Sequence, residues 1–309
     1  MTHIAVLGST NTDLVAYVEK APQRGETVTG RAFRTIPGGK GANQAISPTL
    51  GFARPEGPPP ARAGATVSVI GAVGNDGLGS RLRSTLEHSG VDTDHLHTTE
   101  GPSRTAHIVV DDEGSNAIVV IPGANGTVDH LAPGDEGLIA AADALLLQLE
   151  IPLAAVLAGA RTAQAHGVRT ILTPAPARPL PPELLAAIDL LVPNEHEAAT
   201  LTGVPDPRAA AYVLLDQVPE VVITLGPAGC LYAARGQEPV TVPAPKVTAV
   251  DSTGAGDTFV GALAVALTET RPMREALAWA AAAAALSVQR AGASASMPTR
   301  QEIEAQFTS

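Results

Sequence analysis

The sequence predicts an α/β protein in which helices cover both faces of a mainly parallel central sheet. Short, continuous apolar runs recur along the chain, for example at residues 3–8, 66–73 and 143–149. Such runs are typical of strands that are buried on both faces. Stretches with helical character, such as residues 153–166, separate these runs. Strands that alternate with helices in this way pair in parallel, which gives the predicted fold class.

The later elements continue the alternation. We expect further strands at residues 168–173, 190–192 and 221–225. A helix at about residues 80–89 should end at Gly90, because glycine commonly follows the last turn of a helix. Alanine runs near the C-terminus, above all at residues 276–286, indicate a helix that packs closely on several sides.

A second kind of strand is short, partly alternating and bounded by turns. Strands of this kind are expected at residues 31–36, 105–110 and 116–121. Their pattern is typical of a small, partly exposed sheet rather than of a buried core. We predict that they form a lid from about residues 15–37 and 104–122, inserted into a single domain that spans residues 1–309.

Residues 47–65 interrupt the pattern because they are rich in proline and glycine. A helix that begins near Ala42 should not continue through Pro48, Pro55 and the prolines at 58–60, since proline lacks an N–H donor and its ring clashes with the preceding turn. We therefore expect a surface loop or an insertion here. It is either inert or alters access to the neighbouring glycine-rich segment at residues 38–43.

Composition and charge exclude several classes of function. The chain has 309 residues, of which 45% are hydrophobic and 17% charged, as in globular proteins. A formal net charge of −11 argues against a general binder of nucleic acid or anionic membranes. An anionic substrate such as ATP would then need local positive groups, a metal ion or backbone amides.

Location and redox state also follow from the sequence. The N-terminus lacks the pattern of a secretory leader and no apolar run is long enough for a membrane span, so we expect a cytoplasmic protein. The single cysteine, Cys230, excludes an internal disulfide. We expect it in a turn, as a small apolar residue.

The stretch at residues 250–259 (VDSTGAGDTF) carries the most chemical information. It follows a β-like run and opens an alanine-rich helix, so backbone N–H groups should converge there as an anion site. Gly254 and Gly256 let the backbone approach a ligand closely. A carboxylate at Asp257 would repel a phosphate unless it accepts a proton, which is what a kinase needs at the acceptor hydroxyl. The alternative is an aspartate near a helix cap beside a tight turn.

Two further segments are placed to meet a ligand. Asn11 and Asp13 follow the first strand, where ligands collect in open α/β sheets. They either bind adjacent sugar hydroxyls or close an Asx-turn. Residues 37–45 contain glycines and Lys40 but lack the P-loop spacing. Either Lys40 faces a phosphate or the glycines clear space for a sugar, and we favour a sugar, with Asn43 donating to a hydroxyl.

Other catalytic patterns are not supported. Residues 195–197 (EHE) have metal-ligand side chains but not the HExxH spacing of a zinc hydrolase. The chain has no GxSxG elbow of a serine hydrolase, and no GxGxxG follows the first strand as in dinucleotide oxidoreductases. His88, His95 and His97 are close in sequence, in an expected helix end and loop, and we expect them on a solvated surface.

The combined motifs resemble the ribokinase/PfkB family of carbohydrate kinases. The similar segments follow the family's order along nearly the whole chain: residues 8–13 (GSTNTD), 22–30 (PQRGETVTG), 38–44 (GGKGANQ), 123–125 (GAN), 148–150 (QLE), 174–178 (PAPAR), 193–197 (PNEHE), 224–226 (TLG) and 251–257 (DSTGAGD). The GGKGANQ and DSTGAGD segments are specific as a pair. The resemblance implies a ribokinase-like α/β fold with a small β-sheet lid.

The resemblance also implies roles for individual residues. Asp257 matches the catalytic base, and Gly254, Ala255 and Gly256 match the anion hole. The sugar would be held by Asn11, Asp13, Gly39, Lys40, Gly41, Asn43, Glu150 and Asp257. ATP would be held by Asn194, Thr224, Gly226, Gly229 and Gly256, and Mg²⁺, through water, by Glu197 and Asn194. A monovalent cation, K⁺, is implied at Asp251, Thr253, Ser287, Arg290, Gly292 and Ser296.

The implied reaction is the ATP-dependent phosphorylation of the primary 5-hydroxyl of D-ribose by a homodimer that is joined through the lid. Alternatives that stay open are another sugar, such as deoxyribose or a fructose-type ketose, a nucleoside, and a non-catalytic sugar-binding protein on the same scaffold. Arg104 and His107 depart from the family's usual pattern near the sugar, where a small Thr-Gly pair is common. Arg104 could therefore narrow the sugar pocket or change its charge. Ala281 lies where related enzymes often carry a polar residue by the adenine, which implies looser base selectivity.

Overall fold

The computed structural model describes residues 2–49 and 65–307. Within these residues the main sheet has nine strands in the order β13-β12-β11-β10-β9-β8-β1-β4-β5. The pairings from β11 to β5 are parallel, whereas β12 and β13 are antiparallel additions at one edge. The strands are β1 (His3–Leu7), β4 (Thr66–Gly74), β5 (Leu96–Thr99), β8 (Ala144–Leu147), β9 (Arg169–Leu172), β10 (Leu190–Leu191), β11 (Glu220–Thr224), β12 (Cys230–Ala234) and β13 (Val240–Val242).

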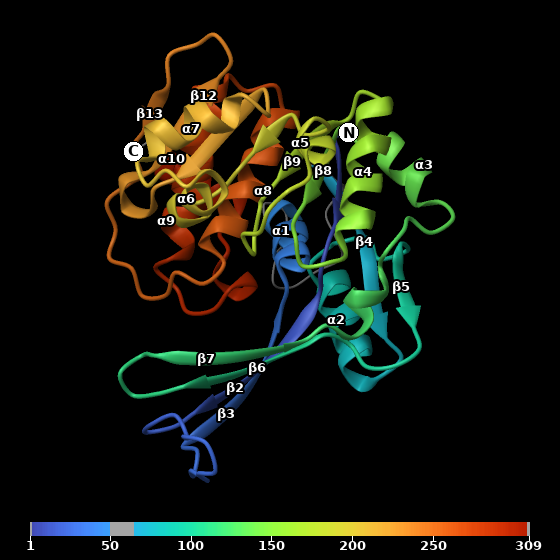
Figure 1. Ribbon diagram of the computed structural model, residues 1–309, viewed down its shortest axis with the longest axis vertical. Helices are drawn as coiled ribbons and strands as arrows, with labels where there is room; N and C mark the ends of the chain where they lie inside the picture. The colour runs from blue at the N-terminus through green and yellow to red at the C-terminus, as the bar shows by residue number, and fades with distance from the viewer. Residues whose placement is uncertain (1, 50–64, 308–309) are drawn as a thin grey trace.

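Helices cover both faces of this sheet (Figure 1). They are α1 (Lys40–Thr49), α2 (Gly77–His88), α3 (Asp135–Ala140), α4 (Leu153–Ala165), α5 (Pro182–Leu185), α6 (Glu195–Thr202), α7 (Pro207–Leu215), α8 (Ala255–Thr268), α9 (Met273–Ser287) and α10 (Arg300–Phe307). Alternate side chains of β1 point to opposite faces. Ile4 and Val6 pack with α1, α8 and α9, while Ala5 and Leu7 pack with α4 and α7. The predicted α/β fold with a mainly parallel, doubly covered sheet is confirmed.

A second, four-stranded sheet is formed by β2 (Asn11–Tyr17), β3 (Ala32–Gly38), β6 (Thr105–Val110) and β7 (Asn116–Ile121), in the order β3-β2-β6-β7. It projects from the main body as a twisted ribbon (Figure 1). Every residue of β7 is exposed, including Val119 at 61% and Ile118 at 53%. We call this sheet the lid, as in the sequence-based prediction. Its strands leave a solvent-facing apolar surface.

The expectation that α1 could not continue through Pro48 is wrong. The helix extends to Thr49 and contains Pro48 in its last turn. A proline there removes only one late hydrogen bond of the helix. Its ring packs on Gly261 of α8, where an added Cβ would lie 3.0 Å from the Pro48 Cδ and 2.5 Å from the Ser47 Cβ. The remaining part of the predicted proline-rich insertion, residues 50–64, lies outside the described residues.

Two smaller expectations also need correction. Cys230 is the first residue of β12 rather than part of a turn, and its burial raises the pKa of its thiol to about 12. His95 and His97 do not lie on a simple solvated surface, because His97 belongs to β5 and both rings contact the buried Asp135. None of the helices within residues 2–49 and 65–307 is long and apolar enough to cross a bilayer.

Candidate active site

Asp257 lies in the first turn of α8, where two distant parts of the chain meet. Its side chain is buried, and its residue is 7% exposed. The Asn43 amide donates to Asp257 Oδ2 at 3.0 Å, and the Gln44 amide donates to Oδ1 at 3.0 Å. Both donors belong to α1. The two glycine-rich motifs of the sequence therefore converge on one carboxylate.

The helix start beside Asp257 has the geometry of an anion site. Gly254 is the N-cap and adopts φ = +75°, a conformation that suits glycine. An added Cβ at Gly254 would lie 3.0 Å from Ala293 Cα. The Thr258 amide donates to the Gly254 carbonyl, which is the first hydrogen bond of the regular helix. The Gly256 amide lies before this bond, among the N-terminal amides that have no acceptor four residues earlier in the helix. The amide of Ala255 is less free, because it donates to the Ser252 carbonyl at 3.2 Å.

Burial raises the pKa of Asp257 above that of an ordinary aspartate. The positive charge of Lys40 and the hydrogen bonds from Gln44 and Asn43 partly oppose this shift, while the negative charge of Glu150 adds to it. A carboxylate with a raised pKa is a stronger base than a solvated one. Asp257 is therefore better suited to accept a proton than its residue type alone suggests.

A second group of polar side chains is organised around Glu150 at the carboxyl end of β8. Glu150 Oε2 accepts from the Ser9 hydroxyl at 2.6 Å and from the Lys40 backbone amide at 2.9 Å. Arg104 donates to Glu150 Oε1 at 3.0 Å and to Asn11 Oδ1 at 2.8 Å. Glu150 thereby links the end of β1, through Ser9, to the residue before the lid strand β6, through Arg104. The Arg104–Glu150 ion pair is largely buried, with side chains 10% and 14% exposed.

Asn11 and Asp13 lie at the start of β2, not in a loop after β1. The Asn11 amide donates to Asp13 Oδ1 at 2.6 Å, so both polar ends of Asn11 are engaged. Burial raises the pKa of Asp13, although the Asn11 hydrogen bond lowers it in part. Burial also acts to raise the pKa of Glu150, but the charge of Arg104 and the hydrogen bonds outweigh it, and the pKa of Glu150 is lowered. Glu150 is thus an ionised, firmly held carboxylate.

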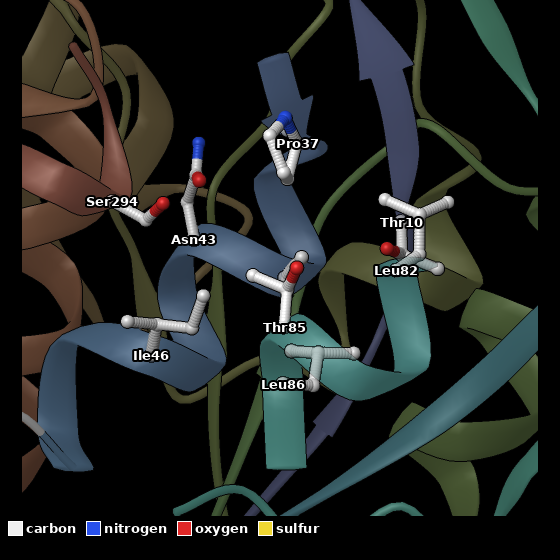
Figure 2. A pocket seen from close by; sticks show the side chains of 10 residues that line it. Thr10, Pro37, Asn43, Ile46, Leu82, Thr85, Leu86 and Ser294 are labelled. Carbon is white, nitrogen blue, oxygen red and sulfur yellow. The ribbon is translucent and has the colours of Figure 1, made fainter. Parts of the chain in front are cut away.

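The glycines of the GGKGANQ segment allow this close assembly. An added Cβ at Gly41 would lie 2.5 Å from the Ser9 backbone nitrogen. Gly39 has φ = +103°, and an added Cβ there would lie 2.8 Å from Thr10 Cα. Larger residues would therefore push the start of α1 away from the end of β1. Next to this contact, a small cavity lies between α1 and α2. Asn43 lines it, and in Figure 2 its side chain lies between Ser294 and Pro37.

Four of the five residues predicted to bind nucleotide lie at the end of β11 or in the segments after β10 and β11, whereas the fifth, Gly256, lies in the first turn of α8. Asn194 caps α6 in a reciprocal pair of hydrogen bonds with Glu197, at 2.8 and 2.9 Å. Thr224 pairs with Asn194 in a β-bridge and begins the turn that contains Gly226. Gly229 has φ = +99°, and its absent Cβ makes room for the Val242 carbonyl. The bridge between Thr224 and Asn194 thus brings the segment after β10 beside the end of β11.

Glu197 connects these segments with Asp257. Burial raises the pKa of Glu197, and the charges of Lys40 and Asp257 also act on it. Its Oε2 takes part in the helix cap, while Oε1 accepts no hydrogen bond within the described part of the chain. A partly buried carboxylate oxygen with no protein donor suits a Mg²⁺ ion held through water. The donor set therefore fits the ion that the sequence implied.

The predicted cation residues come together only in part. Asp251 joins the two segments, because its carboxylate accepts from the amides of Thr253 at 2.9 Å and Gly292 at 2.8 Å. The Arg290 guanidinium instead pairs with Glu302. The hydroxyls of Ser287 and Ser296 donate to carbonyls within their own turns, Ala284 and Ala293. Any ion here would have to be held largely by backbone carbonyls.

Some residues of the site were not assigned from the sequence. Gln44 lies within the GGKGANQ motif, yet only the structure gives it a contact with Asp257. Its carbonyl accepts from Gln148 at 2.6 Å, which continues the network to the end of β8. Ser9 holds Glu150, and Arg104 was noticed only as a departure from the family pattern. Membership of the matching motifs was the available signal for Gln44, Gln148 and Ser9.

Comparisons with known proteins agree with this architecture. The model of the pfkB family carbohydrate kinases matches residues 1–300. The chain is 42% identical to a ribokinase of Bacillus subtilis over 98% of this chain and 99% of the relative. It is 40% identical to a ribokinase of Schizosaccharomyces pombe, over 99% and 98% of the two chains. The structure of Arabidopsis thaliana ribokinase complexed with ribose and ATP superposes with a TM-score of 0.92 at 32% identity, covering 100% of both chains. The chain belongs to the pfkB family of carbohydrate kinases.

Proposed function

We propose that this kinase transfers the γ-phosphoryl group of ATP to the primary 5-hydroxyl of D-ribose. The observation that carries the proposal is the position of Asp257, which lies at the start of α8 and is bonded to Asn43 and Gln44 of α1. An acceptor hydroxyl next to this carboxylate would also face the amides at the helix N-terminus. Full-length similarity to ribokinases, one of them complexed with ribose and ATP, supports the choice of substrates.

In the proposed mechanism, Asp257 accepts the hydroxyl proton as the sugar oxygen attacks the γ-phosphorus in line, and the bond from the γ-phosphorus to the bridging oxygen breaks on the opposite side to release ADP. The raised pKa of Asp257 favours this acceptance. The backbone at Gly254 and Gly256 stabilises negative charge on the transferring oxygens, together with the positive end of the α8 dipole. The Ala255 amide would join them only by giving up its hydrogen bond to the Ser252 carbonyl. Mg²⁺, held through water by Glu197 and Asn194, would neutralise phosphate charge when bound.

The sugar would lie between Asp257 and the group formed by Asn11, Asp13 and Glu150. The backbone of Lys40 faces Glu150, whereas the ammonium charge of Lys40 acts on both Asp257 and Glu197. Lys40 is therefore suited to the boundary between the sugar and the phosphates. ATP would lie along Asn194, Thr224, Gly226 and Gly229.

A different acceptor sugar remains a second candidate because of Arg104. Its guanidinium occupies the centre of the polar group and already binds Asn11 and Glu150. A sugar must either use the remaining N–H groups of Arg104 or displace it. This favours small acceptors with closely spaced hydroxyls over larger hexoses and nucleosides.

A coupled assay of ADP release tests the proposal across D-ribose, deoxyribose, fructose and adenosine. We expect D-ribose to have the highest kcat/KM. If another sugar is phosphorylated and ribose is not, the enzyme is a kinase of the same family with a different acceptor. No turnover of any acceptor, with sugar binding retained, would instead support a non-catalytic sugar-binding protein.

Three further features belong to this proposal. A K⁺ ion near Asp251 and Gly292 would stabilise the start of α8. A comparison of kcat/KM in K⁺ with kcat/KM in a bulky organic cation would test this.

The exposed apolar strand β7 would be covered in a homodimer joined through the lid. A cytoplasmic location would place the enzyme where ATP is abundant, and cell fractionation would test this.

A further inference from the structure

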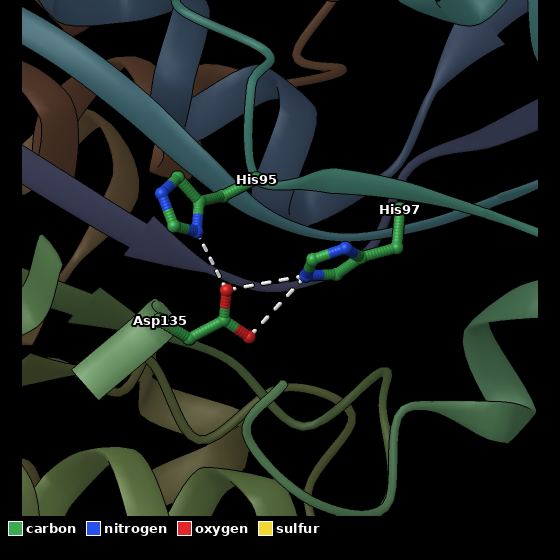
Figure 3. Close-up of side chains that lie close together, drawn as sticks. All are labelled: His95, His97 and Asp135. Carbon is green, nitrogen blue, oxygen red and sulfur yellow. Dashed lines mark hydrogen bonds and ion pairs between the residues drawn. The ribbon is translucent and has the colours of Figure 1, made fainter. Parts of the chain in front are cut away.

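His95, His97 and Asp135 form a compact cluster outside the proposed active site. Figure 3 shows the two imidazole rings turned toward the Asp135 carboxylate from one side. His95 Nδ1 lies 2.7 Å and His97 Nε2 lies 3.1 Å from Asp135 Oδ1. All three donor atoms lie within 4.8 Å of one another. They come from the turn before β5, from β5 itself and from the first residue of α3.

The chemistry of these donors suits a transition-metal ion. Two imidazole nitrogens and a carboxylate are typical ligands of Zn²⁺, and water can complete its coordination. The Asp135 carboxylate is also fixed through its second oxygen, because the Ala132 amide donates to Oδ2 at 2.8 Å. Such an outer hydrogen bond orients a ligating carboxylate. The cluster thus has both the ligands and the support of a metal site.

The burial of the three side chains and their access from solvent also suit the binding of an ion. The Asp135 side chain is only 2% exposed, whereas the His95 and His97 side chains are 24% and 37% exposed. An ion can therefore reach the carboxylate from the side of the rings. Gly134 lacks a side chain next to the His95 ring, where an added Cβ would lie 3.1 Å from Cε1. The ring has room to adjust.

The observed geometry is a hydrogen-bonded state in which the ligand atoms lie within 4.8 Å of one another, so the two rings must draw in around an ion. Ligands of tetrahedral zinc with bonds of about 2.0–2.1 Å lie about 3.3 Å apart. The separation of His97 from Asp135 is already close to this value, and His95 must move back by about 0.6 Å. On ion binding, each ring carries its proton on the other nitrogen, so the ligating nitrogens of His95 and His97 are unprotonated.

We propose that His95, His97 and Asp135 bind one Zn²⁺ ion, or a similar divalent transition metal, at a site separate from that of the catalytic Mg²⁺. The ion would join β5 to α3; among the described residues, β5 pairs with β4 alone, at the edge of the main sheet. A buried carboxylate is compensated more strongly by a divalent cation than by hydrogen bonds from imidazole N–H groups. The site would therefore stabilise this edge of the sheet.

The test is a Zn²⁺ titration of the full-length, tag-free protein by isothermal calorimetry in excess Mg²⁺. The variants are His95→Gln and His97→Gln, since glutamine retains an amide donor for Asp135 but is a poor zinc ligand. His88→Ala is the matched control, because within residues 2–49 and 65–307 this exposed histidine bonds only to Ser84 of its own helix. Thermal melting with and without Zn²⁺, and after EDTA, gives a second readout that is independent of kinase activity.

We expect one Zn²⁺ per chain in the wild type and in His88→Ala, with a melting temperature that rises on binding. Each glutamine variant should lose at least about tenfold in affinity. The proposal is overturned if the wild type shows no saturable binding, or if both glutamine variants bind as tightly as the wild type. Circular dichroism of the metal-free variants verifies that they fold, and their half-exposed positions make folding the expected result.

Discussion

Arg104 should be important both for stability and for sugar binding, and Arg104→Ala tests this. The substitution removes hydrogen bonds of 2.8 Å to Asn11 and 3.0 Å to Glu150. It leaves Glu150, whose side chain is 14% exposed, without its positive partner. Breaking a buried ion pair costs about 3–5 kcal/mol. Since both side chains keep slight exposure, we expect the lower end, a loss of about 3 kcal/mol in the free energy of unfolding.

In a thermal melt this loss corresponds to a decrease of about 6 °C, at about 2 °C per kcal/mol for a large chain. The matched control is Arg208→Ala, because Arg208 and Glu238 form an ion pair at 3.4 Å that is mostly exposed. The control should change stability by less than about 1 kcal/mol. A double-mutant cycle with Glu150→Gln should give a coupling energy above about 1 kcal/mol.

The pH dependence follows from the lowered pKa of Glu150. The unfolded state then binds a proton at Glu150 more readily than the folded state does. The stabilisation is fully present above the ordinary glutamate pKa of about 4.3 and is lost as the pH falls through the lower, folded value. Arg104→Ala should therefore reduce the acid dependence of stability.

Kinetics separate a structural role of Arg104 from a role at the sugar. The hydrogen bonds of Asp257 do not involve Arg104, so kcat should change little in Arg104→Ala. KM for the sugar should rise about tenfold, and discrimination against fructose should weaken as space opens. Arg104→Lys should be intermediate, because one ammonium cannot bridge Asn11 and Glu150 as a guanidinium does. An Arg104→Ala variant with wild-type stability, KM and selectivity would refute this reasoning.

Three further predictions concern the catalytic base, the helix start and the lid. Asp257→Asn should keep sugar binding, measured by calorimetry, while kcat falls at least ~10²-fold; near-normal turnover would reject Asp257 as the base. Gly254→Ala should destabilise the protein by about 2 kcal/mol and lower kcat, because of its φ of +75° and the contact with Ala293. Gly167→Ala is the control for the backbone strain alone, because Gly167 has φ = +70° and no heavy atom of the described residues lies within 4 Å of an added Cβ. Equal losses of stability in the two variants would contradict a role of the Ala293 contact. Val119→Asp should convert the expected homodimer to a monomer in light scattering, whereas a monomeric wild type would exclude a lid-mediated dimer.

The arrangement of the main elements could be predicted because each depends on local pattern. Apolar runs such as β1 and β4 are recognisable without knowledge of their partners. The glycine motifs also marked the starts of α1 and α8, since both require close backbone approach. The error at Pro48 arose because the packing of its ring on Gly261 is not a local property.

The sequence by itself determined the fold class, the family and the position of Asp257 at the glycine-rich start of a helix. Only the tertiary structure decided what surrounds each charge. Burial among α1 and α8 raises the pKa of Asp257, and Arg104 reaches Glu150 across 46 residues of sequence. His95 meets Asp135 across 40 residues, which changes a predicted surface histidine into a candidate metal ligand. Electrostatic and hydrogen-bonding partners are set by distance in space, and local sequence patterns do not encode that distance.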